Sequence, residues 1–136
     1  MASNKKIGNT FETELCETLF EYGFWSHNFT QNQAGQPADM IAVRNMRPYL
    51  IDCKVCEHDR FPLTRIEENQ MNAMKLWQSC GNGSGWFALK ISSGIYFIAL
   101  ADLELHGVLK KQKALTETSI KKLGYPLERW CECRFM

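Results

Sequence analysis

Two acidic residues and a lysine have the types and the spacing of a metal-dependent hydrolytic site. Asp39 opens one apolar stretch, and Asp52 and Lys54 lie two residues apart within another. Alternate residues of a strand point to the same face, so Asp52 and Lys54 should share a face, about 7 Å apart. If the two stretches pair as a hairpin, Asp39 lies beside Asp52. Two adjacent carboxylates repel each other unless a divalent cation lies between them, and Mg²⁺ prefers such oxygen ligands.

A lysine beside such a cation has a chemical use, because an ammonium group stabilises negative charge that develops in a transition state or positions a water molecule. The alternative is an ordinary surface hairpin whose three charged side chains face water. Both stretches are otherwise apolar, with residues such as Ile41 and Leu50. Charges in such surroundings are unusual unless they have a function. The pattern therefore favours the site over the plain hairpin.

A third carboxylate can approach from the first predicted helix. Glu12 is four residues before Cys16 and seven before Leu19, so it borders the apolar stripe of that helix. Glu14 lies about 200° further around the helix and should face water. We therefore expect Glu12, and not Glu14, to approach the two aspartates.

The elements that must position these residues can be predicted along the chain. Capping residues and apolar periodicity predict one helix from Asn9 or Thr10 to about Tyr22, and another from a capping box at Thr64 to about Trp77. Alternating and β-prone stretches predict strands at residues 24–29, 39–43, 49–55, 86–91 and 95–100, followed by short helices at 103–109 and 117–123. The order α-β-β-β-α-β-β indicates a mixed α/β or α+β domain.

Length and composition limit the class of protein. A chain of 136 residues has the size of one domain, so we predict a single domain over residues 1–136 with a flexible arm at 1–7. Its 45% hydrophobic and 23% charged residues are typical of a folded globular protein. No apolar run approaches the ~20 residues of a membrane-spanning helix, and the first residues are too polar for a signal peptide. We therefore expect an intracellular, cytoplasmic protein that does not contact a membrane.

Cysteines and charge give weaker signals. Cys53 and Cys56 have the C-x2-C spacing of a zinc site, but the second pair, Cys131 and Cys133, does not, so we expect no structural zinc. Sixteen Lys/Arg balance fifteen Asp/Glu, so a DNA-binding surface requires local clustering. Four arginines are candidates for phosphate contacts around the site, and a lysine run is either a DNA-binding or a solvated face. These residues are Arg44, Arg47, Arg60 and Arg65, and Lys110, Lys111, Lys113, Lys121 and Lys122.

Three short segments together resemble the motifs of the PD-(D/E)XK nuclease superfamily. They are Gly8-Asn9-Thr10-Phe11-Glu12, Pro37-Ala38-Asp39 and Asp52-Cys53-Lys54. Within that superfamily the chain resembles the Holliday junction resolvases, in particular the RecU type, because residues 61–70 (FPLTRIEENQ) are similar to the segment that follows the catalytic lysine there. The resemblance extends from residue 8 to about residue 103. Asp52 stands where Glu is more frequent, which shortens the ligand by one methylene and keeps its chemistry.

The resemblance implies an αβββαβ core, a homodimer and Mg²⁺-dependent hydrolysis of DNA, with Mn²⁺ able to replace Mg²⁺. It makes Asp39, Asp52 and the backbone carbonyl of Cys53 ligands of the metal, and Glu12 a ligand through a water molecule. It makes Lys54 the catalytic lysine. The side chains to which it gives catalytic roles are Glu12, Asp39, Asp52, Lys54 and Gln70.

We therefore expect a metal-dependent DNA endonuclease that resolves four-way (Holliday) junctions by paired nicks, in a bacterial or phage context. Two alternatives stay open. One is a nuclease of the same fold that acts on flaps, nicks or specific duplex DNA. The other is a DNA-binding module whose acidic site does not cleave. Mg²⁺-dependent nicking distinguishes an enzyme from a binding module.

Overall fold

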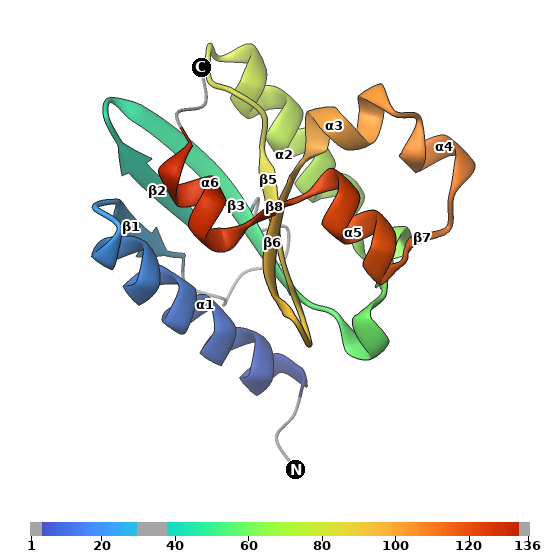
Figure 1. The fold of residues 1–136 in the computed structure, drawn as a ribbon. Coiled ribbons are helices and arrows are strands. Elements are labelled where there is room, and N and C mark those ends of the chain that lie inside the picture. Colours follow the sequence, from blue (N-terminus) through green and yellow to red (C-terminus); the bar gives the residue numbers. More distant parts are fainter. Residues whose placement is uncertain (1–3, 30–37, 134–136) are drawn as a thin grey trace.

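The protein folds around one mixed sheet, which runs through the centre of the molecule (Figure 1). The computed structural model describes residues 4–29 and 38–133, with side chains from Thr10 onward. Six strands are hydrogen-bonded in the order β1-β2-β3-β5-β6-β8. All neighbours are antiparallel except β3 and β5. The strands are β1 (Trp25–Asn28), β2 (Met40–Arg44), β3 (Arg47–Val55), β5 (Trp86–Ile91), β6 (Gly94–Ala99) and β8 (Tyr125–Pro126). This mixed sheet confirms the predicted fold class.

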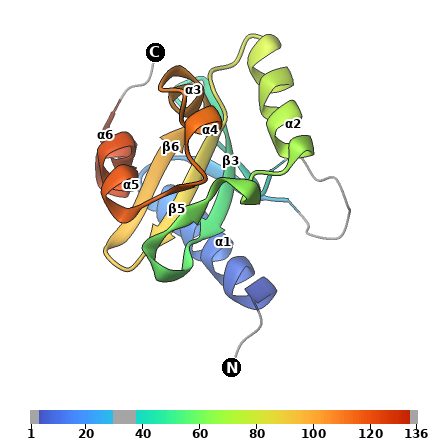
Figure 2. The ribbon, with the colours of Figure 1, turned by 90° about the vertical axis from the view of Figure 1, so that its right-hand side faces the viewer.

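Helices cover both faces of the sheet (Figures 1 and 2). On one face, α1 (Asn4–Glu21) and α6 (Leu127–Glu132) share a hydrophobic core that contains Leu15 and Trp130. On the other face, α2 (Glu68–Ser79), α3 (Leu100–Leu105), α4 (Val108–Lys111) and α5 (Glu117–Leu123) share a second core that contains Met74 and Ile120. None of the helices in the described part of the chain is both long and apolar enough to cross a membrane.

Strand β3 contributes to both cores because its side chains alternate between the two faces. Leu50 belongs to the core beneath α2, and Ile51 belongs to the core beneath α1. The same alternation places Asp52 and Lys54 on the Leu50 face. It also separates the C-x2-C cysteines, since Cys53 packs against the α1 core and Cys56 lies in the α2 core. The two thiols therefore lie on opposite sides of the sheet and cannot share a metal ion.

The first helix begins earlier than predicted. α1 starts at Asn4, so residues 4–7 belong to the helix. Asn9 and Thr10, the predicted caps, lie inside the helix. Residues of this type favour caps because they can bond to the backbone, but they accept helical geometry when the turns on either side continue. Residues 1–3 lie outside the described residues, and so do residues 30–37, which the sequence pattern leaves as a loop between the strands predicted at 24–29 and 39–43.

The second helix begins later than predicted. The segment that contains Thr64 forms a short 3₁₀ helix, η2 (Leu63–Arg65), and α2 follows Glu67. Before it, η1 (Glu57–Asp59) and β4 (Phe61–Pro62) follow β3, and β4 pairs with the distant β7 (Ala114–Leu115). The Leu63 N–H donates to the Lys113 carbonyl at 2.9 Å. This pairing keeps the segment from continuing as part of the α-helix, so the cap of α2 moves to Glu67.

The C-terminal segment shows the largest difference from prediction. The predicted helix at 103–109 is divided between α3 and α4 at Gly107, which adopts a left-handed φ of 66°. β8 and α6 were not predicted at all. The side chain of Trp130 in α6 is fully buried and stacks on Phe97 with ring centroids 4.1 Å apart. A helix of six residues is not stable alone, so α6 depends on this tertiary contact.

Candidate active site

A tight turn sets the register of the β2–β3 hairpin. Asn45 and Met46 have φ of 54° and 66°, the left-handed values of a two-residue type I′ hairpin. Arg44 thereby pairs with Arg47, and Met40 pairs with Ile51. A shift of one residue would turn every side chain of a strand to the opposite face. The turn therefore decides which residues meet at the far end of the hairpin.

At that far end Asp39 is bonded to the backbone of β3. Its N–H donates to the Ile51 carbonyl at 3.1 Å, and its Oδ2 accepts the N–H of Cys53 at 2.7 Å. These two bonds hold the Asp39 carboxylate close to Asp52, whose pKa it raises. The structure therefore brings together the two aspartates singled out in the sequence.

Asp52 is fully buried, which is rare for a carboxylate and costly unless it is paired. Its Oδ1 accepts a hydrogen bond from Gln70 Nε2 at 3.1 Å, and its Oδ2 lies 3.0 Å from Lys54 Nζ. Burial raises the pKa of Asp52 well above its ordinary value, and the charge of Asp39 raises it further. The ammonium of Lys54 acts in the opposite direction. The ionised form of Asp52 therefore depends on Lys54.

Gln70 connects the second helix to this pair. Its Nε2 donates to Asp52, and its Oε1 accepts from Lys54 Nζ at 3.4 Å and from the Glu67 N–H at 3.3 Å. One amide thus contacts the buried carboxylate, the lysine and the first turn of α2. Asp52, Lys54 and Gln70 are all nearly inaccessible to solvent. The arrangement keeps the lysine head at a defined position.

Helix α1 presents Glu12 to the sheet. Glu12 is 8% exposed, whereas the side chain of Glu14 is 60% exposed. This confirms the rotation of the helix predicted from its apolar stripe. Burial raises the pKa of the Cys53 thiol, and nearby carboxylates, Glu12 among them, raise it further. Glu12 therefore lies near Cys53 on the α1 side of the sheet.

Two of the four candidate arginines do not lie at the site. Arg44 and Arg47 flank the turn of the hairpin, at the end away from the aspartates. Arg44 places its guanidinium 4.1 Å from the ring centroid of Phe24, in a structural contact. Arg65 is better placed, because it is exposed and its Nη1 donates to the Val55 carbonyl at 2.7 Å, one residue beyond Lys54. Spacing along the chain could not separate the arginines at the site from those away from it, because all four candidates are close to Asp39 or Lys54 in the sequence.

The donors at the site suit a hard divalent cation. Asp39 and Asp52 supply carboxylate oxygens, and the buried Oδ2 of Asp52 has the ammonium of Lys54 as its ion-pair partner at 3.0 Å. A cation would bind that oxygen and reduce the repulsion between the carboxylates, in competition with Lys54. Within residues 10–29 and 38–133, no three His, Cys, Asp or Glu side chains already surround one point. The ion would therefore need further oxygen ligands from the backbone, water or substrate.

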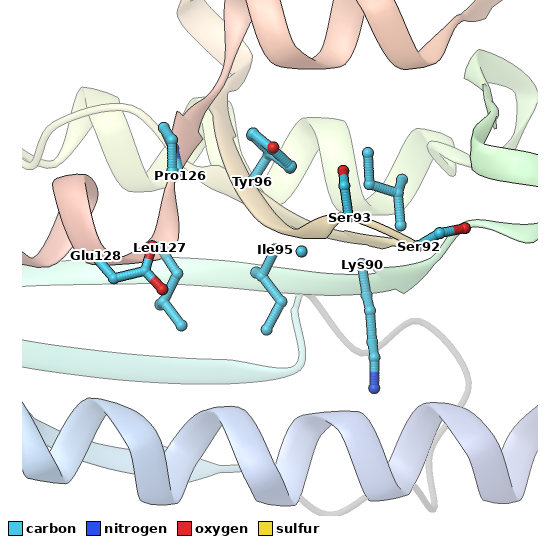
Figure 3. Close-up of a pocket in the computed structure, with 10 residues that line it drawn as sticks. Lys90, Ser92, Ser93, Ile95, Tyr96, Pro126, Leu127 and Glu128 are labelled. Atoms are coloured by element: carbon cyan, nitrogen blue, oxygen red, sulfur yellow. The ribbon is translucent and has the colours of Figure 1, made fainter.

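A surface hollow of about 380 Å³ lies elsewhere, where the β5–β6 hairpin meets β8 and α6. Lys90, Ile95 and Leu127 extend from it toward α1, and Tyr96 extends to the opposite side (Figure 3). None of the predicted site residues lines this hollow. The candidate site is thus the end of the β2–β3 hairpin.

Comparisons with known proteins identify the family. The family model described as archaeal Holliday junction resolvase (Hjc) matches residues 3–123. The structure of Archaeoglobus fulgidus Hjc, a Holliday junction resolvase from an archaeal hyperthermophile, is similar with a TM-score of 0.67. The sequences are 17% identical, over 95% of this chain and 98% of that chain, a likeness that shows the fold. No curated protein sequence matches the chain.

These findings support the resolvase assignment at the level of the family. The PD-(D/E)XK-like fold expected from the sequence is confirmed. The narrower resemblance to the RecU type is not confirmed, because the matching family model is that of the archaeal resolvases. The match covers nearly the whole chain, from α1 through α5, and includes every residue of the candidate site. The chain belongs to the archaeal Holliday junction resolvase family, whose members are endonucleases.

Proposed function

We propose that the protein resolves four-way DNA junctions by divalent-metal-dependent hydrolysis of phosphodiesters, with Mg²⁺ as the ion and Mn²⁺ as a substitute. One observation carries this proposal. A buried Asp52 touches Lys54 and Gln70 and lies beside Asp39, in a chain of the resolvase family. A surface hairpin without a catalytic role would have no reason to bury a carboxylate at this cost.

The cation would be held by Asp39, Asp52 and the backbone carbonyl of Cys53, with Glu12 contributing through a water molecule. When bound, such an ion polarises the scissile phosphate and lowers the pKa of water. The residues of the chain prepare the site for it. The hydrogen bond from the Cys53 N–H orients Asp39, and the amide of Gln70 orients Asp52.

Lys54 would act on the phosphate itself. Its side chain is 12% exposed and its ammonium is held by Asp52 and Gln70, so it loses little freedom when substrate binds. A preorganised positive charge in a nearly dry site stabilises the charge that develops on a phosphoryl group. Gln70 is then a positioning residue, because it fixes both Lys54 and Asp52 and need not touch the DNA.

The active form would be a homodimer. A symmetric dimer carries two equivalent sites, and a four-way junction offers two symmetrically related strands. Each site would nick one of them. Paired nicks follow from this symmetry and not from the chemistry of a single site.

Cleavage assays with end-labelled DNA test the proposal. In Mg²⁺ the protein should nick opposing strands of a four-way junction at least about 100-fold faster than linear duplex of the same sequence, a conservative threshold beside the roughly 1,000-fold or more by which proteins prefer specific to non-specific DNA. Removal of the metal with a chelator should abolish both reactions. Equal rates on the two substrates would favour a general nuclease of the same fold. Binding without cleavage in any divalent ion would favour the DNA-binding module.

The rotation of α1 provides a separate test of the site. Glu12→Gln should lower the cleavage rate by about 10-fold or more, the effect expected when a positioned catalytic carboxylate is neutralised. Glu14→Gln, two residues away on the exposed side, is the matched control. It should leave the rate unchanged and alter stability by no more than about 0.5 kcal/mol. An inactive Glu14 variant beside an active Glu12 variant would show that the wrong carboxylate was assigned.

A further inference from the structure

The positive charge of the chain is concentrated in one C-terminal segment. Residues 110–122 contain five lysines and one glutamate, a net charge of +4. The whole chain has a net charge of +1, so the remaining residues together carry −3. The small net charge of the protein thus conceals a basic segment on an otherwise acidic molecule. Local clustering of this kind is what attraction to phosphates requires.

Four of these five lysines form no ion pair with a described residue, and three of the four lie close together at α4 and β7. Lys110 and Lys111 end the short helix α4, and Lys113 follows two residues later; all three are exposed. Four ion pairs occur among the described residues, and only that of Lys121 with Glu117 involves the segment. A solvated face would commonly alternate charges of both signs, as α5 does with this pair. The α4–β7 turn instead presents uncompensated positive charge.

The fold ties this turn to the candidate active site. The Lys113 carbonyl accepts the N–H of Leu63 at 2.9 Å, beside the β4–β7 pairing. Two residues after Leu63, Arg65 donates to the carbonyl of Val55, which follows Lys54 in β3. In Figure 2 the green segment after β3 and the orange segment after α4 run side by side. The segment that carries Lys113 is thus connected to β3, next to Lys54, through two hydrogen bonds and the few residues between Leu63 and Arg65.

We propose that Lys110, Lys111 and Lys113 form a backbone-binding surface for one duplex arm of the junction, beside the site that cuts it. This inference rests on the proposed function. Lysine is a flexible point charge without the planar fork that reads base edges, so contacts of this kind position DNA irrespective of its sequence. The surface would set the orientation of the arm, while the carboxylates and Lys54 act near the branch point.

The test measures the salt dependence of binding to a fluorescent four-way junction in Ca²⁺, between about 50 and 200 mM salt. Each lysine on a phosphate contributes about 0.9 to the slope of log K against log salt. The triple variant Lys110→Gln, Lys111→Gln, Lys113→Gln should therefore flatten the slope by about 2.7 and weaken binding about 10-fold or more at about 100 mM salt. The triple change to Arg keeps the charges and should restore both values.

A second triple variant controls for total charge. Arg47→Gln, Lys75→Gln and Arg129→Gln remove the same number of exposed charges from the hairpin turn, α2 and α6. Its slope should remain that of the wild type. If both triple variants change equally, or if the α4–β7 variant matches the wild type, the basic surface is a solvated face and the inference fails while junction cleavage stands. A wild-type protein that neither binds nor cuts any DNA overturns both.

Discussion

Asp52→Asn and Asp39→Asn should each reduce junction cleavage by at least about 1,000-fold while leaving junction binding intact. A metal ion stabilises a phosphoryl transition state by several kcal/mol, and each factor of ten corresponds to about 1.4 kcal/mol. Loss of one carboxylate ligand removes most of this stabilisation by the metal ion. Binding survives because carboxylates repel DNA and contribute nothing to its attraction. Single-turnover cleavage and anisotropy binding measurements separate the two effects.

Asp52→Asn should also change how the stability of the metal-free protein depends on pH. The pKa of Asp52 is raised in the folded state, chiefly by burial and then by Asp39. The folded protein therefore holds a proton that the unfolded chain releases above pH about 4, the usual range of an aspartate. Wild-type stability then falls as the pH rises from there through the folded pKa. Asparagine does not ionise, so denaturation at several pH values should show an advantage for the variant that grows toward neutral pH.

Asp102→Asn is the matched control for both measurements. Asp102 lies in the first turn of α3, on a different element from the site, and it is part-exposed. Its change should leave cleavage near the wild-type rate and should give no comparable pH-dependent gain in stability. Cleavage near the wild-type rate in both the Asp39 and the Asp52 variants would remove the proposed site.

Lys54→Gln should have the next largest effect, a loss of about 100- to 1,000-fold in the cleavage rate, comparable to removal of a preorganised donor from an oxyanion site. The glutamine can still accept or donate a hydrogen bond near Asp52, but it cannot neutralise developing charge. Lys75→Gln, an exposed lysine of α2 that pairs with Glu104 at 3.8 Å, is the control and should cleave normally. A rate within a few-fold of the wild type for Lys54→Gln would show that this lysine only balances the charge of Asp52.

The sequence by itself determined the features that depend on local periodicity. Alternation placed Asp52 and Lys54 on one face of a strand, and it predicted the hairpin that brings Asp39 beside them. The apolar stripe of the first helix distinguished Glu12 from Glu14, and burial confirms that Glu12 faces the sheet and Glu14 faces water. Such patterns can be read from one chain because the side chains of a strand or helix repeat at a fixed interval.

The place of Gln70 at the site could not be predicted from local periodicity. Nothing in its spacing pointed to the site, and only the resemblance to a nuclease family singled it out. Its contact with Asp52 and Lys54 requires α2 to begin after Glu67, and that start depends on the pairing of β4 with β7, more than 50 residues further along the chain. The local sequence offers two capping boxes, one at Thr64 and one at Glu67, and the distant strand pairing decides between them.

Tertiary structure alone decided three further features. Arg44 and Arg47 lie at the wrong end of the hairpin for phosphate contacts, although their distance along the chain from Asp39 is small. The last helix exists because Trp130 fills the α1 core, a contact that no six-residue segment can encode by its own propensity. Lys113 lies beside the segment that follows β3 because β7 pairs with the distant β4. Each depends on residues distant in sequence that meet only after folding, so a pattern confined to neighbouring residues cannot contain them.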